Sequence, residues 1–552
     1  MSKIGRSMVL LAGSFLLCCF DGAFAQTLDW PMFGQNTGNT GSNSSKTSIS
    51  SSNAARLIQK WTFTTSGDVT ARAAVVDGVA YFPDWGGNVT AVDASTGIQK
   101  WSHPLTDYGL AAGTVCRTSP AVANGVVYIG TQWVASGPTG WLLAIDAKTG
   151  SLVWKVQPDT SNPFPVITGS SAVANGIVYV SMTSNEEFAA GLDPSYNCCS
   201  ASGSVVAVSA ATGANLWQTF TVPPGYSGGA VWGSNPVVDA ARGTVFVGTG
   251  NNYSHPTDPS YVACVSKGTG NGNDNWNGKT EAHCLSSDDH ADSILALDMY
   301  TGAIKWATRL MNWDQPYVAG SDDWNTSCIF GPTPQQPGPN CPAPLPTAAN
   351  PNQPTGPDFD FGSAPKEITY QTRKGPKTII GAGQKSGIYY ALDPDKGKVL
   401  WTTQVGPGSS LGGIEWGSAT DGTRIYVAIA NLYGIPYGAG SAGSWAALDP
   451  ATGAILWQKA DPNGAIDIGP MSVANGVVYA GSMGGASSTS AQTMFALDAA
   501  NGNTLWSFAP GSSVNAGATI VNGVVYWGSG YRHLGPLGTG NNQLFAFSLP
   551  GY

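Results

Sequence analysis

The sequence predicts an all-β protein, an eight-bladed β-propeller whose last blade is closed by both termini. Two observations carry this prediction: the composition and an internal repeat. Only 11% of the 552 residues are charged, while Gly occurs 72 times and Pro 36 times. Few charges and many turn formers argue against long surface helices and favour many short strands.

A ten-residue phrase recurs along the chain, as in VDASTGIQKW ending at Trp101. The other complete copies end at Trp154, Trp217, Trp306, Trp401, Trp457 and Trp506. Between them stands a second phrase, as in SPAVANGVVYIGT, whose alternating apolar residues predict half-buried strands and whose NG pair predicts a tight hairpin turn. Each unit is about four short strands. Because one such sheet cannot bury both faces alone, the sheets are expected to stack around an axis, with each closing Trp between adjacent blades.

The two ends of the chain set the number of blades. The last residues, LFAFSLPGY, are the first half of the phrase without its Trp, whereas ARLIQKW, ending at Trp61, lacks a first half. Joining them completes an eighth blade and removes a free sheet edge. Seven blades is the alternative.

The first 25 residues have the features of a secretory signal peptide. Lys3 and Arg6 precede an apolar run that is too short to span a bilayer, and Ala23-Phe24-Ala25 offers a cleavage site. We therefore expect a periplasmic or secreted protein with one propeller domain over 26–552 and long insertions at about 252–292 and 315–375. The net charge of −9 is spread without runs, so no nucleic-acid partner is expected. No other long apolar run follows the first 25 residues, so no membrane span is expected either.

Seven cysteines remain after the signal peptide, and most should be paired in an oxidising compartment. Cys264 and Cys284 fall in one insertion, and Cys328 and Cys341 in the other, where disulfides would staple long loops. Which cysteine pairs with which is not fixed by the sequence. The remaining three are Cys116 and the adjacent Cys198 and Cys199.

The phrase A-x-D-x-x-T-G-x-x-x-W behind a signal peptide resembles the pyrroloquinoline quinone (PQQ) alcohol dehydrogenases over essentially the whole mature chain. NEE before the Cys pair, GGAVWGSNPVVD, GTGNNYS and PDFDFGSAP are similar to its polyvinyl-alcohol-dehydrogenase-like branch. Non-catalytic propellers of outer-membrane assembly share the repeat, so the site residues decide between enzyme and scaffold.

The resemblance implies a cofactor and metal site. Candidate PQQ-contacting residues are Arg117, Thr168, Thr183, Cys198, Cys199, Trp232 and Lys385. Glu186, Asn251 and Asp314 match calcium-binding positions, with Glu187 as the alternative to Glu186. Asp314 also stands eight residues after Trp306, where the family has its catalytic Asp. Pro316 occupies the position that is acidic in lanthanide-using relatives, which favours calcium.

These residue types suit alcohol oxidation. Carboxylate and amide oxygens are calcium ligands, Trp232 offers a flat face to the quinone ring, and Lys385 would stabilise charge on the quinone oxygen. Asp314 would accept the hydroxyl proton as general base. The resemblance also implies a Cys198–Cys199 disulfide against the quinone; the alternative is that each pairs elsewhere, for instance with Cys116.

The expected activity is oxidation of hydroxyls, secondary ones above all, of an alcohol, a polyol or a poly(vinyl alcohol)-like polymer. No CxxCH haem motif occurs in the chain, so a separate acceptor such as an exported cytochrome c is expected. The alternatives are a non-catalytic envelope scaffold and a quinoprotein acting on sugars or amines.

Overall fold

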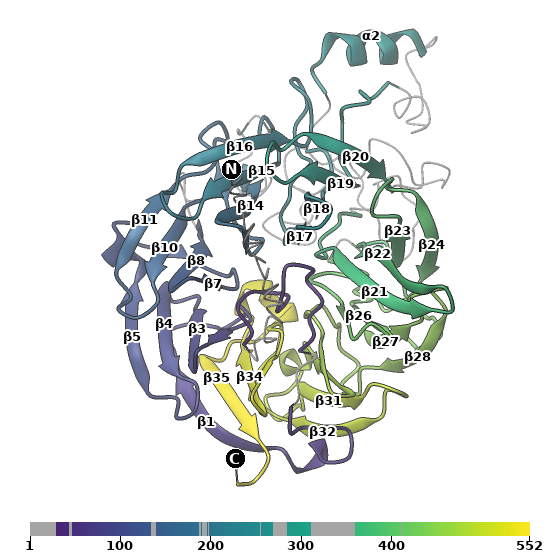
Figure 1. Ribbon diagram of the computed structural model, residues 1–552. Coiled ribbons are helices and arrows are strands. Elements are labelled where there is room, and N and C mark those ends of the chain that lie inside the picture. Colours follow the sequence, from purple (N-terminus) through teal and green to yellow (C-terminus); the bar gives the residue numbers. More distant parts are fainter. Residues whose placement is uncertain are drawn as a thin grey trace, which may run out of the picture.

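The computed structural model describes residues 29–43, 47–133, 140–186, 189, 196, 198–253, 256–268, 284–310, 359–409 and 411–551. Eight antiparallel sheets stand around a central axis (Figure 1). In each sheet the first strand lies at the axis, where it contacts the first strand of a neighbouring blade, and the last strand lies at the rim. The expected eight-bladed propeller is confirmed, and the seven-bladed alternative is wrong.

The blades follow one another along the chain. Blade 1 contains β2 (Ala74–Val76), β3 (Val79–Pro83), β4 (Asn88–Asp93) and β5 (Gln99–Pro104). Blade 2 contains β7 (Ala121–Ala123), β8 (Val126–Gly130), β10 (Leu142–Asp146) and β11 (Leu152–Val156). Blade 3 contains β13 (Ala172–Ala174), β14 (Ile177–Ser184), β15 (Ser204–Ser209) and β16 (Asn215–Phe220), with β12 (Pro165–Val166) added on β14. Blade 4 contains β17 (Val237–Asp239), β18 (Thr244–Gly248), β19 (Ser293–Asp298) and β20 (Ile304–Arg309).

The second half of the ring repeats the pattern. Blade 5 contains β21 (Lys366–Thr372), β22 (Gly375–Gly383), β23 (Ile388–Leu392) and β24 (Val399–Gln404). Blade 6 contains β25 (Ala419–Thr420), β26 (Ile425–Ile429), β27 (Ser444–Leu448) and β28 (Ile455–Ala460). Blade 7 contains β29 (Ser472–Ala474), β30 (Val477–Gly481), β31 (Met494–Asp498) and β32 (Thr504–Phe508). Blade 8 contains β33 (Thr519–Val521), β34 (Val524–Ser529), β35 (Gln543–Ser548) and the N-terminal β1 (Ile58–Thr64).

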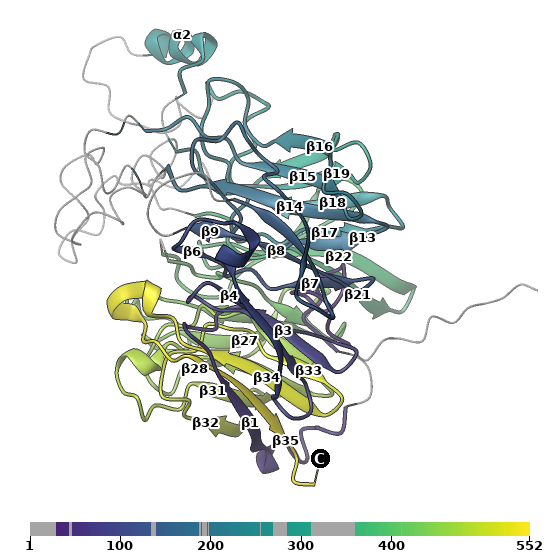
Figure 2. The same cartoon turned by 90° about the vertical axis from the view of Figure 1, so that its left-hand side faces the viewer.

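A few short elements lie outside the blades. β6 (Thr114–Val115) and β9 (Gln132–Trp133) pair in a small antiparallel sheet of their own. The short helices η2 (Leu105–Tyr108), η3 (Gly484–Ala486) and η4 (Arg532–Leu537) lie in loops. Helix α2 (Pro259–Gly268) stands out from the ring (Figure 2) and is tied to the chain by the Cys264–Cys284 disulfide. Over the described ranges, no helix has both the length and the apolar character needed to cross a bilayer.

The Trp that closes each phrase joins its blade to the next one. The Trp61 indole donates to the Ala94 carbonyl at 3.1 Å and its ring covers Gly97, where an added Cβ would lie 2.8 Å from the indole. The same donation recurs from Trp101, Trp154, Trp217, Trp306, Trp401 and Trp457 to the following blades. Glycine is required beneath the ring because its φ is positive and no side chain fits there.

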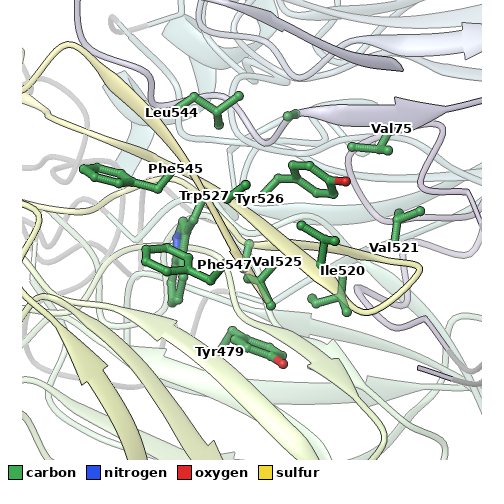
Figure 3. Packing of buried hydrophobic residues seen from close by; sticks show 14 of the residues in the cluster. Val75, Tyr479, Ile520, Val521, Val525, Tyr526, Trp527, Leu544, Phe545 and Phe547 are labelled. Carbon is green, nitrogen blue, oxygen red and sulfur yellow. The ribbon is translucent and has the colours of Figure 1, made fainter. Parts of the chain in front are cut away.

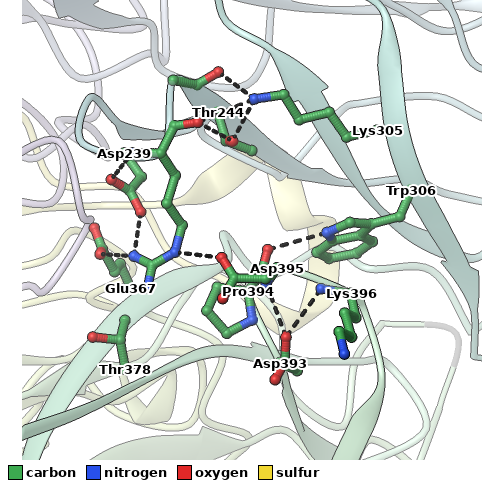
Figure 4. A network of polar contacts seen from close by, with 12 residues as sticks. Asp239, Thr244, Lys305, Trp306, Glu367, Thr378, Asp393, Pro394, Asp395 and Lys396 are labelled. Atoms are coloured by element: carbon green, nitrogen blue, oxygen red, sulfur yellow. Dashed lines mark hydrogen bonds and ion pairs between the residues drawn. The ribbon is translucent and has the colours of Figure 1, made fainter.

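Polar contacts add to the joint between blades 4 and 5 (Figure 4). Arg242 bonds to Asp239 at 2.6 Å and to Asp395 of the next blade at 2.9 Å, and lies 3.6 Å from Glu367. Burial, reinforced by Asp239 and opposed by Arg242, raises the pKa of Glu367. The Trp306 indole donates to the Pro394 carbonyl within the same interface.

Blade 8 closes the ring from both ends of the chain. β1 pairs antiparallel with β35, from Ile58 opposite Ser548 to Thr64 opposite Gln543. Trp527 and Phe547 of this blade pack with Tyr479 of blade 7 and Val75 of blade 1 in one continuous apolar cluster (Figure 3). Burial of this cluster across three blades stabilises the ring at its closure.

The segment 29–43, purple at the centre of Figure 1, plugs the axis. Going along this segment, its backbone forms hydrogen bonds with the first strands of successive blades around the ring. The partners are Val75, Val122, Val238, Glu367, Thr420 and Val473. Arg72, almost fully buried, donates to the Phe33 and Met471 carbonyls and so fixes the plug to blades 1 and 7. The repeat had not predicted this segment, because the segment contains no copy of either phrase.

Candidate functional site

The candidate site residues converge at one end of the axis because of where they stand relative to the strands. Arg117, Thr168 and Trp232 each lie just before the first strand of a blade, at β7, β13 and β17. Asn251 and Lys385 lie just after second strands, β18 and β22. Since first and second strands are antiparallel, the start of one and the end of the other meet at the same end of the sheet.

The centre of the site is a buried carboxylate, Asp360, just before β21. Its Oδ2 accepts hydrogen bonds from the Lys385 ammonium at 2.9 Å and from the Trp232 indole at 2.8 Å. Its Oδ1 accepts the Asn251 backbone N–H at 2.9 Å. Asp360 and Lys385 form an ion pair whose side chains are only 6% and 7% exposed, respectively. Charge-assisted hydrogen bonds of this kind are strong and fix the geometry.

Two glycines let the backbone approach this group. A Cβ on Gly250 would lie 2.8 Å from Asp360 Oδ1, and one on Gly362 would lie 2.7 Å from the Trp232 ring. The Lys385 nitrogen lies 4.8 Å from the centroid of the Trp232 ring. The cation therefore stands near the flat face of an aromatic ring at the end of the axis.

A second aromatic and cationic pair adjoins the first. The Trp416 ring meets Trp232 edge-on at 5.2 Å, and the Arg117 guanidinium lies 3.9 Å from the Trp416 centroid. Glu415 is 4% exposed, and its Oε2 accepts no hydrogen bond from the described residues. Burial raises the pKa of Glu415 to about 7, with Lys385 and Arg117 opposing the shift and Asp360 adding to it.

A cavity of about 30 Å³ opens beside Arg117, Thr168 and Trp416, with Phe33 of the plug in its lining. The Thr168 hydroxyl donates to the Trp232 carbonyl at 2.6 Å. The structure thus brings together five of the predicted residues: Arg117, Thr168, Trp232, Asn251 and Lys385.

Glu186 lies in a neighbouring loop of its own. Its carboxylate accepts hydrogen bonds from the Tyr196 hydroxyl at 2.6 Å, from the Ser200 backbone N–H at 2.9 Å and hydroxyl at 3.0 Å, and from the Ala201 N–H at 2.5 Å. The Ala201 carbonyl in turn accepts from Gly228, whose neighbour Gly229 donates to the Asn251 carbonyl. Two backbone segments therefore link Glu186 to Asn251.

Cys198 and Cys199 are joined to each other by a disulfide directly before Ser200. This pairing was implied by the resemblance, and the alternative of pairing with Cys116 is wrong, because Cys116 is a buried free thiol. Thr183 is buried at the end of β14, with its hydroxyl 3.5 Å from the Tyr253 hydroxyl. Cys328, Cys341, Glu187 and Asp314 lie outside the described residues.

The sequence reasoning missed Asp360, Glu415 and Trp416, although it held a signal for each. Asp360 stands in the stretch PDFDFGSAP, which had been noted without a role. GGAVWGS, which carries Trp232, recurs as GGIEWGS with Glu415 and Trp416 in it. Comparing the two copies would have placed a second Trp at the same level of the axis, two blades further on.

The site contains oxygen atoms that could bind a metal, but among the described residues these atoms are not grouped into a metal-binding cluster. Across the described ranges, no three Asp, Glu, His or Cys side chains are grouped as a metal site. Among the described residues of the site, Asn251, Asp360 and Glu415 at the axis and Glu186 in the neighbouring loop offer hard-oxygen donors. Such oxygens are the ligands that calcium takes in proteins.

Known proteins with similar sequences place the chain in a family. A model of the family described as "Outer membrane protein assembly factor BamB" matches residues 33–308 and 384–543. A polyvinyl alcohol dehydrogenase of Sphingopyxis sp. (strain 113P3) is 31% identical over 90% of this chain and 73% of its own. A second polyvinyl alcohol dehydrogenase, from a Pseudomonas species, is 29% identical with the same coverage. The chain belongs to the PQQ-dependent quinoprotein alcohol dehydrogenase family.

A solved structure agrees in fold with this quinoprotein. The quinohemoprotein alcohol dehydrogenase of Comamonas testosteroni superposes with a TM-score of 0.66, covering 96% of this chain and 81% of its own at 19% identity. The polyvinyl alcohol dehydrogenases named above confirm the expected family, its polyvinyl-alcohol-dehydrogenase-like branch and the enzyme class of PQQ-dependent alcohol dehydrogenase.

Proposed function

We propose that this quinoprotein is an exported, PQQ- and calcium-dependent dehydrogenase that oxidises hydroxyl groups, secondary ones above all, of an alcohol or a poly(vinyl alcohol)-like polymer. Electrons would pass to an external acceptor such as cytochrome c. The observation that carries the proposal is the Asp360–Lys385 ion pair beside the Trp232 ring, at the end of the axis where five predicted residues meet.

The residues at the axis fit the cofactor. PQQ is a flat quinone with three carboxylates, and Trp232 and Trp416 offer aromatic faces while Lys385 and Arg117 supply positive charge. Stacking and charge-assisted hydrogen bonds are the interactions that such a ligand needs. When bound, PQQ supplies the acceptor for the two electrons that leave the alcohol. Thr168, Thr183 and the Cys198–Cys199 disulfide are proposed as further contacts.

Calcium would be held by oxygens of Glu186, Asn251 and a catalytic Asp. The Glu186 carboxylate already accepts hydrogen bonds from Tyr196, Ser200 and Ala201, so binding of a cation replaces part of this set. When bound, calcium supplies Lewis acidity toward the quinone carbonyl.

The general base is best assigned to Asp360. It is buried, it is held by three donors, and it stands beside Trp232 and Lys385, so a hydroxyl group at the axis would find it oriented. Taking the hydroxyl proton onto Asp360 frees the oxygen to form a carbonyl group, while Lys385 keeps positive charge beside it. Asp314 stays the alternative that the sequence spacing predicted.

Substituting each aspartate in turn tests the proposal. Apoprotein would be titrated with PQQ and calcium, and dye-linked oxidation of secondary alcohols, poly(vinyl alcohol), primary alcohols and sugars measured. We expect turnover on secondary hydroxyls, and a loss of about 10²–10⁴-fold in kcat in Asp360→Asn with PQQ absorbance retained. Asp314→Asn is the matched control and is expected to keep most of its turnover.

Three outcomes would overturn part or all of this proposal. Failure of the wild-type protein to bind PQQ would favour the alternative of a non-catalytic envelope scaffold. Loss of turnover in Asp314→Asn with Asp360→Asn active would return the base to the position given by the spacing. Oxidation of sugars alone would keep the cofactor and change the substrate class.

A further inference from the structure

The loop between β28 and β29 buries two carboxylates, away from the residues used above. Asp461 and Asp467 begin and end the stretch DPNGAID, and their exposed fractions are 4% and 0%, respectively. Aspartate is seldom buried to this degree unless it is paired with a cation or well supplied with hydrogen bonds.

The loop is wound so that both carboxylates share one space. Asp461 Oδ1 accepts the Asn463 backbone N–H at 2.5 Å, and Gly464 turns the chain with a φ of +68°. The Ala465 carbonyl is held by the Gly443 N–H at 2.8 Å. Both aspartates also adjoin Gly443: its carbonyl accepts the Asp461 backbone N–H at 2.9 Å, and an added Cβ on Gly443 would lie 2.7 Å from the Asp467 backbone nitrogen.

Three of the four carboxylate oxygens are left without donors. Asp461 Oδ2 and both oxygens of Asp467 accept no hydrogen bond from the described residues. Within the same ranges, no Lys, Arg or His forms an ion pair with either side chain. By contrast, Asp360 receives donors on both of its oxygens. An unneutralised buried carboxylate pair is strongly unfavourable, so this pair needs a bound cation or a proton.

We propose that Asp461 and Asp467 form a structural Ca²⁺ site. The two oxygens of Asp467 and Oδ2 of Asp461 would be its anionic ligands, and water would complete the shell. Calcium suits an irregular set of oxygens from one loop, whereas Mg²⁺ demands near-ideal octahedral geometry. This site is separate from the calcium proposed at Glu186 and does not depend on PQQ.

The site would also support the cofactor end of the axis. Ile468, directly after Asp467, accepts the Trp416 backbone N–H on its carbonyl at 3.3 Å. A cation that fixes residues 461–467 therefore fixes the backbone to which Trp416 is bonded. Calcium at this loop would order one wall of the axial site without touching a ligand there.

The competing occupant is a proton shared by the pair. Burial raises the pKa of both side chains, and Asp461 raises that of Asp467 further. A shared proton stabilises the fold at low pH and is lost as pH rises through the raised pKa. Calcium needs both carboxylates ionised, so its stabilising effect grows as pH rises.

Two measurements on chelator-treated apoprotein without PQQ distinguish calcium from a shared proton at this pair. They are thermal unfolding and calorimetric titration with calcium. At about 5 mM CaCl₂, above the 10⁻⁴–10⁻³ M range of extracellular calcium modules, we expect the Tm to rise by roughly 2–5 °C. The rise should be larger at pH 8 than at pH 5, and smaller with Mg²⁺. Asp467→Asn and Asp461→Asn should each abolish it.

Controls keep the two calcium proposals apart. Glu186→Gln should keep the calcium-dependent rise in Tm while losing PQQ-dependent turnover, and Asp449→Asn, in an exposed turn of blade 6, should behave as wild type. If Asp467→Asn keeps the full rise in Tm, the calcium site is overturned. A wild-type Tm that ignores calcium and falls as pH rises assigns the space to a shared proton.

Discussion

Among the groups at the axis, Glu415 is a carboxyl group whose burial disfavours its ionised form. It is buried beside Lys385 and Arg117, yet one oxygen has no donor among the described residues, and Asp360 adds a like charge. The net result is a pKa raised from 4.5 to about 7, chiefly by burial. Folding therefore takes up a proton on Glu415 at mildly acidic pH.

This proton uptake predicts how stability depends on pH. Below the unfolded pKa both states carry the proton; above about pH 7 neither does, and the buried carboxylate destabilises the fold. Relative to Glu415→Gln, the wild-type apoprotein should lose about 3 kcal/mol as pH rises from about 4 to about 8. Denaturant unfolding of both proteins across this range measures the difference. A difference independent of pH would contradict the raised pKa.

A site residue could be predicted from the sequence when it stands in a short phrase beside a strand, because its place then does not depend on the rest of the chain. Trp232, Asn251 and Lys385 stand in short phrases next to strands, so each could be placed without knowing the rest of the fold. The resemblance predicts the base at a fixed distance after Trp306, at Asp314, which lies outside the described residues. A long insertion separates β20 from β21, and Asp360 stands at its far end, so the distance along the chain says nothing about the distance to the axis.

At the scale of elements, the joint that recurs between neighbouring blades is a Trp indole of one blade that packs on a glycine of the next. Gly453 has a φ of +76°, and an added Cβ would lie 2.5 Å from the Trp401 ring. The repeat predicted a Trp between blades. The structure adds the close approach of that Trp ring to a glycine with a positive φ in the next blade.

Alanine at two glycines separates these causes. Gly453→Ala and Gly176→Ala share a φ of +76°, but nothing lies within 4 Å of the added Cβ at Gly176. Both should lose about 1–2 kcal/mol from left-handed backbone strain. Gly453→Ala should lose a further 1–3 kcal/mol or so from overpacking against Trp401 and the Thr403 side chain beside it. Equal free energies of unfolding for the two variants would show that the ring does not require glycine.

At the scale of the whole molecule, the ring has one joint built differently from the rest. Trp506 donates to the Leu57 carbonyl at 3.0 Å, just before β1, so blade 7 docks on the N-terminal part of the chain. Here η1 (Ala54–Arg56) stands where the other blades have a turn that ends in Gly, preceded in most of them by Thr. The split phrase predicted the closure, but the plug at 29–43 and this short helix have no repeat pattern and came only from the structure.

Whether the ring unfolds as one unit can be tested at this joint. Trp457 donates to Ala499 at 3.0 Å, the same distance as Trp506 to Leu57, but within the continuous chain. Replacing either Trp by Phe keeps an aromatic ring and removes the hydrogen bond, at a cost of about 1 kcal/mol. In a closed, cooperative ring, Trp506→Phe and Trp457→Phe should lower the Tm equally, each in a single transition by calorimetry. A separate early transition in Trp506→Phe alone would mean that the joint between the termini opens before the other blades unfold.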